Sequence, residues 1–155
     1  MLFGKNKAVS PLVMWAIILA GFFLINVLLP ASTYLYEISP LRYLILPAVA
    51  YFLFFFISAF KEHKQAIMSA ASIDRIVKTG VYRYVRHPIY SADIMLGIGI
   101  FFYAPTIRIM AAVACMIVIL ILWMGLEESA LIEKFGNEYR EYKNEVPMFI
   151  PWLKH

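Results

Sequence analysis

Four apolar segments alternate with polar segments along the chain, at residues 11–29, 43–60, 88–103 and 109–126. A helix needs roughly 20 predominantly apolar residues to cross the hydrocarbon core of a bilayer. The first two segments are about that long, the fourth contains no charged residue, and the third is shorter and contains Asp93. The pattern predicts an all-α integral membrane protein with four transmembrane helices, and we expect residues 1–155 to form a single membrane domain.

The last two apolar segments are separated by residues 104–108 alone, a connection so short that it requires a tight helical hairpin. Two polar segments remain, at 61–87 and 127–155. In the second of these, the sequence SALIEKF (129–135) mixes apolar and charged residues in the way that is typical of an amphipathic helix. We therefore expect a C-terminal helical hairpin plus a cytoplasmic amphipathic helix.

Lysine and arginine residues are distributed unevenly among the loops, which predicts how the helices are oriented. With the N-terminus inside, twelve of the fourteen lie in the three inner segments, and only Arg42 and Arg108 lie in the outer loops. We therefore expect both termini, the amphipathic helix and both polar segments on the cytoplasmic side of a cell inner membrane or an ER-type membrane. The first apolar segment is longer than a signal-peptide core and no small-x-small cleavage site follows it, so we expect it to be retained.

Composition supports the membrane interpretation and limits the chemistry. Hydrophobic residues make up 63% of the chain and charged residues 15%, whereas a soluble domain has roughly a quarter charged residues. Cys115 is the single cysteine, and the histidines at 63, 87 and 155 are widely scattered, so neither a disulfide nor a metal site is expected. The basic cytoplasmic residues favour contact with anionic membrane lipids rather than with nucleic acid.

Two charged motifs flank the predicted hairpin, RHPIY at 86–90 and the glutamate pair at 127–128. The 39 residues of 88–126 are close to two crossings of about 20 residues each, so the chain must return to the depth at which it entered. The arginine and histidine should therefore face the two glutamates. Taken alone, the arginine and histidine are explained as a headgroup anchor, and the glutamate pair as the polar start of an amphipathic helix. Together they predict a site for a zwitterionic ligand, because the cations suit a carboxylate and the glutamates suit an ammonium or a ribose diol.

The third apolar segment contains polar and small residues in a helical pattern. Pro88 suits the first turn of a helix, and Tyr90, Asp93 and Gly97 then share one face. Gly97 and Gly99 would let another helix or a ligand approach closely, and helix packing is the ordinary explanation. A carboxylate at the position of Asp93 is costly without a partner, which leaves open an ion pair that fixes the hairpin or a functional role.

Three ordered motifs resemble the isoprenylcysteine carboxyl methyltransferase family, which consists of integral membrane enzymes that use S-adenosylmethionine. The motifs are TGVYRYVRHPIYSA (79–92), the glutamate pair about forty residues later, and FGNEYREYKNEVPMFIP (135–151). The related phospholipid methyltransferases share the RHPxY and EE elements. The similarity covers residues 74–151, about half of the chain.

The resemblance implies that this half of the chain binds S-adenosylmethionine. The methionine part is expected near residues 82 and 87–90, with the first glutamate on the opposite side and the adenosine part near residues 76–77. Tyr139, Tyr142 and Pro147 match the tail that covers the site, and we expect them to form a structural lid. The expected cofactor-binding residues are Ile76, Val77, Tyr82, Arg86, His87, Pro88, Ile89, Tyr90, Glu127 and Glu128.

Two positions depart from the family pattern. Ala92 replaces a frequent glycine, and Trp123 stands where enzymes that act on prenylcysteine carboxylates typically have an arginine. An arginine would hold a carboxylate acceptor, and an indole cannot. We expect Trp123 to contact a lipophilic acceptor that enters from the bilayer near Trp123 and Met124, although an interfacial anchor is the ordinary role of tryptophan.

The expected function is therefore transfer of a methyl group to a lipophilic, membrane-partitioned acceptor with a carboxylate, amine or thiol. An amine must first lose a proton, and Glu128 or Asp93 are candidates to take it. Two alternatives remain open: an NADPH-dependent reductase of the related sterol reductase fold, and a non-catalytic membrane subunit. The glutamate pair suits a ligand ammonium better than the phosphates of NADPH.

Overall fold

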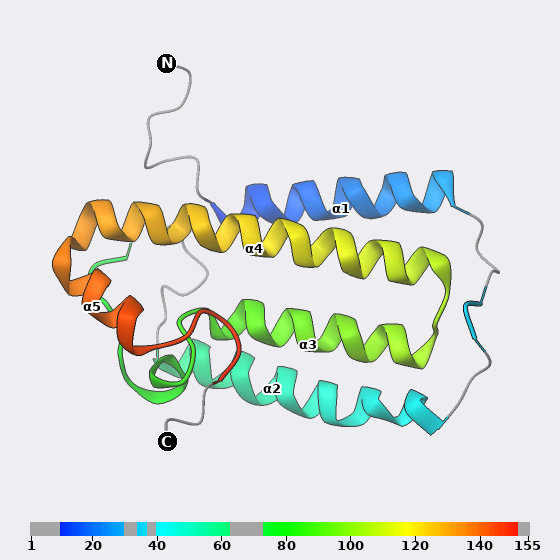
Figure 1. Ribbon diagram of the computed structural model, residues 1–155, viewed down its shortest axis with the longest axis horizontal. Helices are drawn as coiled ribbons and strands as arrows, with labels where there is room; N and C mark the ends of the chain where they lie inside the picture. Colours follow the sequence, from blue (N-terminus) through cyan, green and yellow to red (C-terminus); the bar gives the residue numbers. More distant parts are fainter. Residues whose placement is uncertain (1–9, 30–33, 37–39, 63–72, 152–155) are drawn as a thin grey trace, which may run out of the picture.

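The computed structural model describes residues 10–29, 34–36, 40–62 and 73–151. Within these ranges the protein is all-helical apart from an isolated bridge between Tyr34 and Thr106. The predicted fold class is therefore confirmed in its all-helical character. The α-helices are α1 (Pro11–Leu28), α2 (Ile45–Glu62), α3 (Pro88–Tyr103), α4 (Ile107–Phe135) and α5 (Asn137–Glu145), with short 3-10 helices η1 (Pro40–Leu44) and η3 (Gly80–Arg83) (Figure 1).

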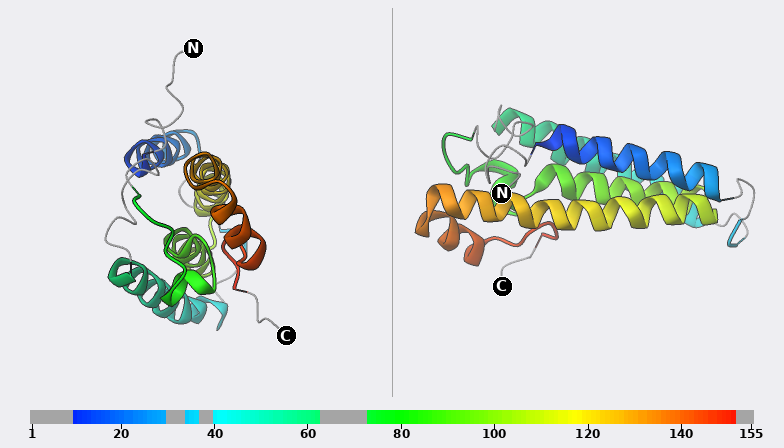
Figure 2. Two further views of the ribbon diagram at one scale, coloured as in Figure 1. Left: turned by 90° about the vertical axis from the view of Figure 1, so that its left-hand side faces the viewer. Right: turned by 90° about the horizontal axis from the view of Figure 1, so that it is seen from above.

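The four longer helices run side by side in one bundle (Figure 1). The end-on view shows α3 between α2 and α4, with α1 against α4 (Figure 2). Helix α5 and the segments that precede η3 and follow α5 gather at one end of this bundle. We call this the α5 end, and the candidate site lies there.

Three helical stretches are long and apolar enough to cross a membrane: Pro11–Leu28, Pro40–Glu62 and Ile107–Phe135. Helix α3 has 16 residues, so its length of about 24 Å falls short of the roughly 30 Å of a hydrocarbon core. Length and composition thus support a membrane protein with three candidate spans, and the expected fourth span stays a prediction. The cationic positions 5, 7, 64 and 154 and the histidines 63 and 155 lie outside the described residues.

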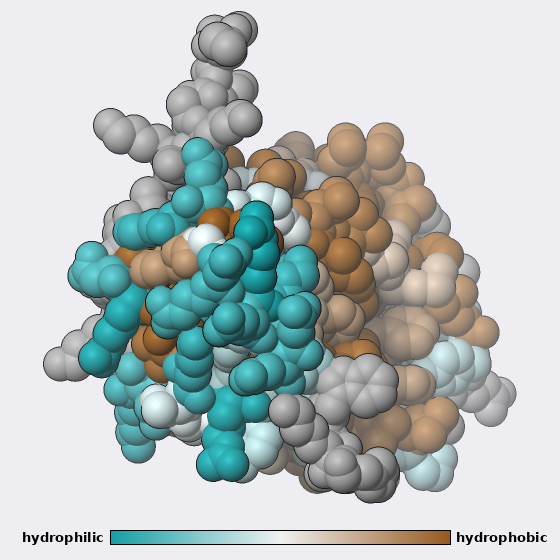
Figure 3. Space-filling view, turned by 60° about the vertical axis from the view of Figure 1, so that its left-hand side comes forward, coloured by the Kyte–Doolittle hydropathy of each residue, from teal (hydrophilic) through white to brown (hydrophobic). Residues whose placement is uncertain are grey.

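The surface agrees with a lipid environment. Large apolar side chains on α1, α2 and α4 are strongly exposed. Five of them are 61% to 81% exposed: Leu12, Leu19, Phe23, Leu46 and Leu122. Figure 3 shows hydrophobic residues over the length of the bundle and hydrophilic residues gathered at the α5 end. An apolar surface of this extent is unusual for a soluble protein and is expected where lipid chains replace water.

The helix expected to run through SALIEKF is present as the end of α4. Helix α4 continues through residues 127–135 without a break, so SALIEKF forms its last turns and not a separate helix. No glycine or proline interrupts the chain between Leu126 and Gly136, and Gly136 then ends α4 with a positive φ of 59°. The separate polar helix of this region is α5.

Arg108 joins α4 to α1 at the end of the bundle opposite the site. Its Nε donates to the carbonyl of Leu29 at 3.2 Å, and its guanidinium also donates to the carbonyl of Asn26 at 3.1 Å. A cation is favourable there because the C-terminus of a helix carries partial negative charge and unpaired carbonyls. One of the two predicted outer cations thus fixes the start of α4 against α1.

The contact between α2 and α3 depends on Gly99. A Cβ added to this residue would lie 2.4 Å from Ala48 Cβ and 3.4 Å from the backbone of Ile45. Neither neighbour is the mobile end of a long side chain, so the two helices would have to separate. This close approach explains a glycine in α3 by packing, as expected from the sequence.

Gly99→Ala should therefore lower the thermal unfolding midpoint in detergent, because overpacking a tight interior contact costs about 1–3 kcal/mol. Gly125→Ala is the matched control: nothing lies within 4 Å of the added carbon, and alanine favours the helix by up to about 1 kcal/mol. Equal midpoints for the two variants would contradict the packing of α2 on α3.

Candidate functional site

A buried ion pair joins the residue before the hairpin to the end of α4. Arg86 Nε and a terminal nitrogen of Arg86 each lie 2.7 Å from Glu128 Oε1, and the two side chains are 6% and 2% exposed. The guanidinium also donates to the carbonyl of Lys143 at 2.8 Å and to that of Val146. Lys143 Nζ pairs with the other oxygen of Glu128 at 2.7 Å. The charges are therefore compensated although water is excluded from them.

The segment after α5 lies along the start of α3. The backbone N–H groups of Arg86 and His87 donate to the carbonyls of Pro147 and Met148 at 2.9 and 3.0 Å. Ser91 Oγ donates to the carbonyl of Phe149 at 2.6 Å. These bonds, together with the bond from Arg86 to Val146, fix the tail across the α5 end of the hairpin.

Glu127, the neighbour of Glu128, is placed differently. Tyr90 Oη donates to Glu127 Oε1 at 2.7 Å, while His87 Nδ1 lies 3.6 Å from Glu127 Oε2. The imidazole lies between the two glutamates, because its Nε2 is 3.3 Å from Glu128 Oε1. The rings of His87 and Tyr90 stack with their centroids 5.7 Å apart. The expected meeting of RHPIY with the glutamate pair is thus present in the structure.

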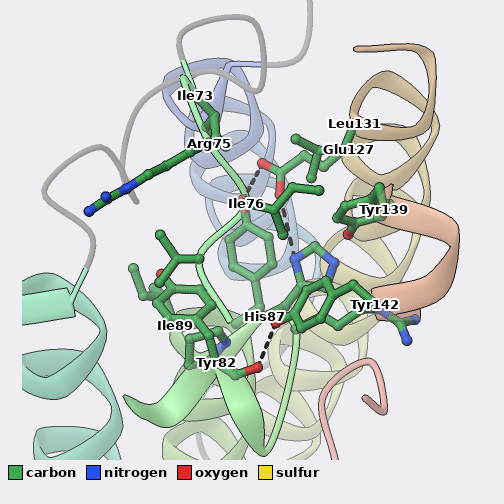
Figure 4. A pocket seen from close by; sticks show the side chains of 14 residues that line it. Ile73, Arg75, Ile76, Tyr82, His87, Ile89, Glu127, Leu131, Tyr139 and Tyr142 are labelled. Atoms are coloured by element: carbon green, nitrogen blue, oxygen red, sulfur yellow. Dashed lines mark hydrogen bonds and ion pairs between the residues drawn. The ribbon is translucent and has the colours of Figure 1, made fainter. Parts of the chain in front are cut away.

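A pocket opens beside Glu127 at the α5 end (Figure 4). Its empty volume is about 640 Å³, including the open mouth. The polar groups of His87 and Glu127 converge on one side, and the rest of the lining is mostly aliphatic and aromatic. Its lining comprises Ile73, Arg75, Ile76, Val77, Tyr82, Arg86, His87, Pro88, Ile89, Tyr90, Glu127, Leu131, Tyr139 and Tyr142.

Nine of the ten residues expected to bind a cofactor line this pocket, and Glu128 does not. Ile73, Arg75 and Leu131 are lining residues that the sequence reasoning missed. Leu131 lies four residues after Glu127 on the same face of α4, so helical spacing was a sufficient signal for it. The segment that contains Ile73 and Arg75 is not helical and offers no such periodicity.

The two tyrosines expected in the lid close one side of the pocket. Tyr142 Oη donates to the backbone carbonyl of Tyr82 at 2.6 Å, which ties α5 to η3. Burial raises the pKa of the phenols of Tyr139 and Tyr142, so both remain neutral hydroxyl groups. Pro147 is not among the lining residues of the pocket; its carbonyl instead accepts the hydrogen bond from Arg86.

Trp123 and Met124 lie inside the bundle and not at the lipid surface. Their exposed fractions are 8% and 0%, and they pack in one core cluster with Met14 and Ile18 of α1. Neither side chain reaches the lipid surface, because α1 covers this face of α4, and the acceptor contact expected of Trp123 stays a prediction. The interfacial-anchor explanation of Trp123 fails for the same reason.

The described residues contain no group of three histidine, cysteine or carboxylate side chains that could hold a metal ion. The polar side of the pocket instead offers carboxylate, imidazole and phenol groups. Such a set can hold an ammonium or a hydroxyl-bearing ligand by hydrogen bonds.

A family model described as phospholipid methyltransferase matches residues 39–138. The matched range includes η1, α2, the pocket-lining segment, α3 and α4. The chain belongs to the phospholipid methyltransferase family. The resemblance inferred from RHPIY and the glutamate pair is thereby confirmed at the level of the family.

Curated relatives of this family member include two kinds of methyltransferase. "Methanethiol S-methyltransferase 1" of Bradyrhizobium diazoefficiens is 39% identical over 79 residues, which are 48% of this chain and 25% of the relative. "Protein-S-isoprenylcysteine O-methyltransferase" of Saccharomyces cerevisiae is 37% identical over 86 residues, which are 50% of this chain and 33% of the relative. The matches thus cover a quarter to a third of these relatives. Their names give no support to the reductase alternative.

In this phospholipid methyltransferase family member, Glu128→Ala should destabilise the fold by about 3–5 kcal/mol, because it leaves Arg86 buried without its carboxylate partner. Chemical unfolding in detergent measures this loss. Hydrogen exchange should also show faster exchange of the Arg86 and His87 amides as the tail detaches.

Lys143→Met is the matched control for this prediction. The Lys143 side chain is 42% exposed, so loss of its pairing with Glu128 should cost at most about 1 kcal/mol. A Glu128→Ala protein as stable as the Lys143→Met protein would contradict a structural role for the buried pair.

Proposed function

We propose that the protein transfers methyl groups from S-adenosylmethionine to a lipophilic acceptor, and that the pocket beside Glu127 holds the methyl donor. The observation that carries this proposal is the position of Glu127: one carboxylate oxygen is engaged by Tyr90, and the other lies 3.6 Å from His87. That second oxygen is beyond ordinary hydrogen-bond distance from the imidazole. It can therefore accept a hydrogen bond from an ammonium or a ribose hydroxyl of the donor.

The remaining lining suits the other parts of the same molecule. Ile73, Ile76 and Leu131 offer apolar walls for an adenine ring, and His87 offers an N–H group for a carboxylate. When bound, S-adenosylmethionine supplies a methyl group on a positively charged sulfur, which leaves as a neutral thioether. The chain therefore needs no general acid on the donor side, and its task is to align the reactants and exclude water.

We further propose four spans with both termini in the cytoplasm. The proposal is supported by the hydrophilic α5 end, where Lys78, Arg83 and Arg86 lie near Lys143 around one open depression. A pocket at this end would face the compartment that contains the water-soluble methyl donor. The uneven distribution of lysine and arginine among the loops supports the same orientation.

The acceptor is proposed to be apolar and to reside in the membrane. The names of the relatives specify methanethiol, a small thiol, and isoprenylcysteine, which carries an apolar isoprenyl chain. The exposed apolar faces of α1, α2 and α4 give such an acceptor a lipid environment next to the site. Surrounding membrane lipids are the other expected partners.

The orientation can be tested with single cysteines in a Cys115→Ala protein. Tyr34→Cys lies at the end opposite α5, and Lys78→Cys and Glu138→Cys lie at the α5 end. Tyr34 is 55% exposed, and the side chains of Lys78 and Glu138 are 42% and 57% exposed. An impermeant thiol reagent added to intact cells should label Tyr34→Cys only. Labelling of the other two before permeabilisation would contradict the proposed orientation.

The donor site can be tested by titrating the detergent-purified protein with S-adenosylhomocysteine. Glu127→Gln should weaken its binding roughly ten- to a hundred-fold, which corresponds to loss of about 1.5–3 kcal/mol from a charge-assisted hydrogen bond. Glu138→Gln, whose side chain is 57% exposed, is the control and should bind like the parent. If the parent shows no binding, the proposed function is wrong; if Glu127→Gln binds equally well, the donor lies elsewhere.

A further inference from the structure

The open depression at the α5 end shares a wall with the pocket. Arg86 and Tyr142 line both hollows. Lys78, Arg83 and Lys143 are the other cations that line the depression, and we call it the cationic depression. Four cations in one hollow repel one another unless anions balance them. Their partners therefore decide what the depression can bind.

Three of the four cations have a carboxylate partner within the protein. Arg86 and Lys143 each lie 2.7 Å from an oxygen of Glu128. Lys78 lies 3.5 Å from Glu138, and both of these side chains are largely exposed. Exposed pairs of this kind add little stability, so Lys78 can exchange its partner for another anion.

Arg83 is the cation without such a partner. None of the ion pairs in the described part of the chain involves it, and its exposed guanidinium lies over the ring of Tyr84, 5.3 Å from the centroid. Four cations thus face three carboxylates, which are Glu128, Glu138 and the lining residue Glu145. The one positive charge that remains matches the single negative charge of a phosphodiester, and an arginine suits phosphate oxygens because it can donate two parallel hydrogen bonds.

The cationic depression lies at the depth where the bundle becomes apolar. Arg86, in its lining, is two residues before Pro88, the first residue of the apolar helix α3. Tyr84, in its lining, and Ile150, in the tail beside it, are 49% and 62% exposed. Tyrosine is enriched at this boundary in membrane proteins, where the lipid headgroups lie. Figure 3 shows the hydrophilic surface of the α5 end bordering the hydrophobic surface of the bundle.

We propose that the cationic depression binds the phosphate group of an anionic phospholipid, with Arg83 as its principal contact and Lys78 as a second. The acyl chains stay in the bilayer beside Tyr84 and Ile150, which favours a lipid over a free phosphate. Anionic lipids are abundant in the cytoplasmic leaflet, the side to which the proposed orientation assigns the α5 end. The lipid is a bound partner and not a methyl acceptor, so this inference goes beyond the proposed function and does not depend on the methyl donor.

The test is native mass spectrometry of the full chain in a neutral detergent, titrated with dioleoyl phosphatidylglycerol or dioleoyl phosphatidylcholine. The first lipid has a net negative charge and no amine, and the second has the same phosphate and chains but no net charge. The parent should bind phosphatidylglycerol at least about five-fold more tightly, which is roughly the effect of one cation near anionic lipid. Arg83→Gln should remove most of this preference. Arg140→Gln is the matched control and should keep it, because Arg140 is an exposed arginine of α5 outside the depression.

Glu145→Gln should change the binding in the opposite direction. Loss of this carboxylate from the depression should strengthen the binding of phosphatidylglycerol roughly two- to five-fold, because a repulsive charge is removed. Glu141→Gln is its matched control, since Glu141 is an exposed glutamate of the same helix outside the depression. It should bind phosphatidylglycerol like the parent.

Unfolding midpoints show whether each variant is folded. Equal binding of the two lipids by the parent, or a folded Arg83→Gln protein that keeps the preference of the parent, overturns the inference. Displacement of phosphatidylglycerol by an equal concentration of glycerol phosphate would identify a site for a free phosphate and also overturns it. If Arg83→Gln does not fold, the two glutamate variants decide, and equal binding of phosphatidylglycerol by both contradicts the site.

Discussion

The buried ion pair between Arg86 and Glu128 is the interaction on which the arrangement of the site depends. It joins three parts of the chain, because Arg86 also binds the carbonyls at the end of α5. Removing one member of such a pair leaves an uncompensated charge, which is far more costly than the loss of an exposed pair. The pair thereby fixes the depth at which the hairpin starts and ends. The hydrogen bond from Tyr90 to Glu127, and with it the pocket, follows from that register.

The two adjacent glutamates have different surroundings because consecutive residues of a helix point about 100° apart. Glu128 faces Arg86 and Lys143, and Glu127 faces Tyr90 and the pocket. His87 contacts both, so it couples the structural pair to the pocket. A charged motif of two identical residues can thus stabilise the fold with one member and leave the other available to a ligand.

The features that could be predicted from the sequence are those set by helix length. The 16 residues of α3 and the short connection to α4 require a hairpin, and the hairpin brings residues 86–90 opposite the glutamate pair. The division of roles between the two glutamates required the direction of each side chain, which depends on the path of the tail at Pro147 and Met148. The burial of Trp123 could not be predicted either, because it results from packing by α1, a helix that is remote in sequence and has no charged residue.

The layer formed by Tyr90 and Glu127 separates two chemically different environments. On the α5 side lie the pocket and a hydrophilic surface, and on the other side lie the apolar core cluster and the lipid-exposed faces of the helices. In the proposed function, a water-soluble methyl donor and a lipid-soluble acceptor approach this layer from opposite sides. The two reactants then need no common entrance. The donor stays in water, and the acceptor stays in lipid, until each binds. The bundle thereby brings together two molecules of different solubility, because it holds the boundary between water and lipid at the position of the reacting groups.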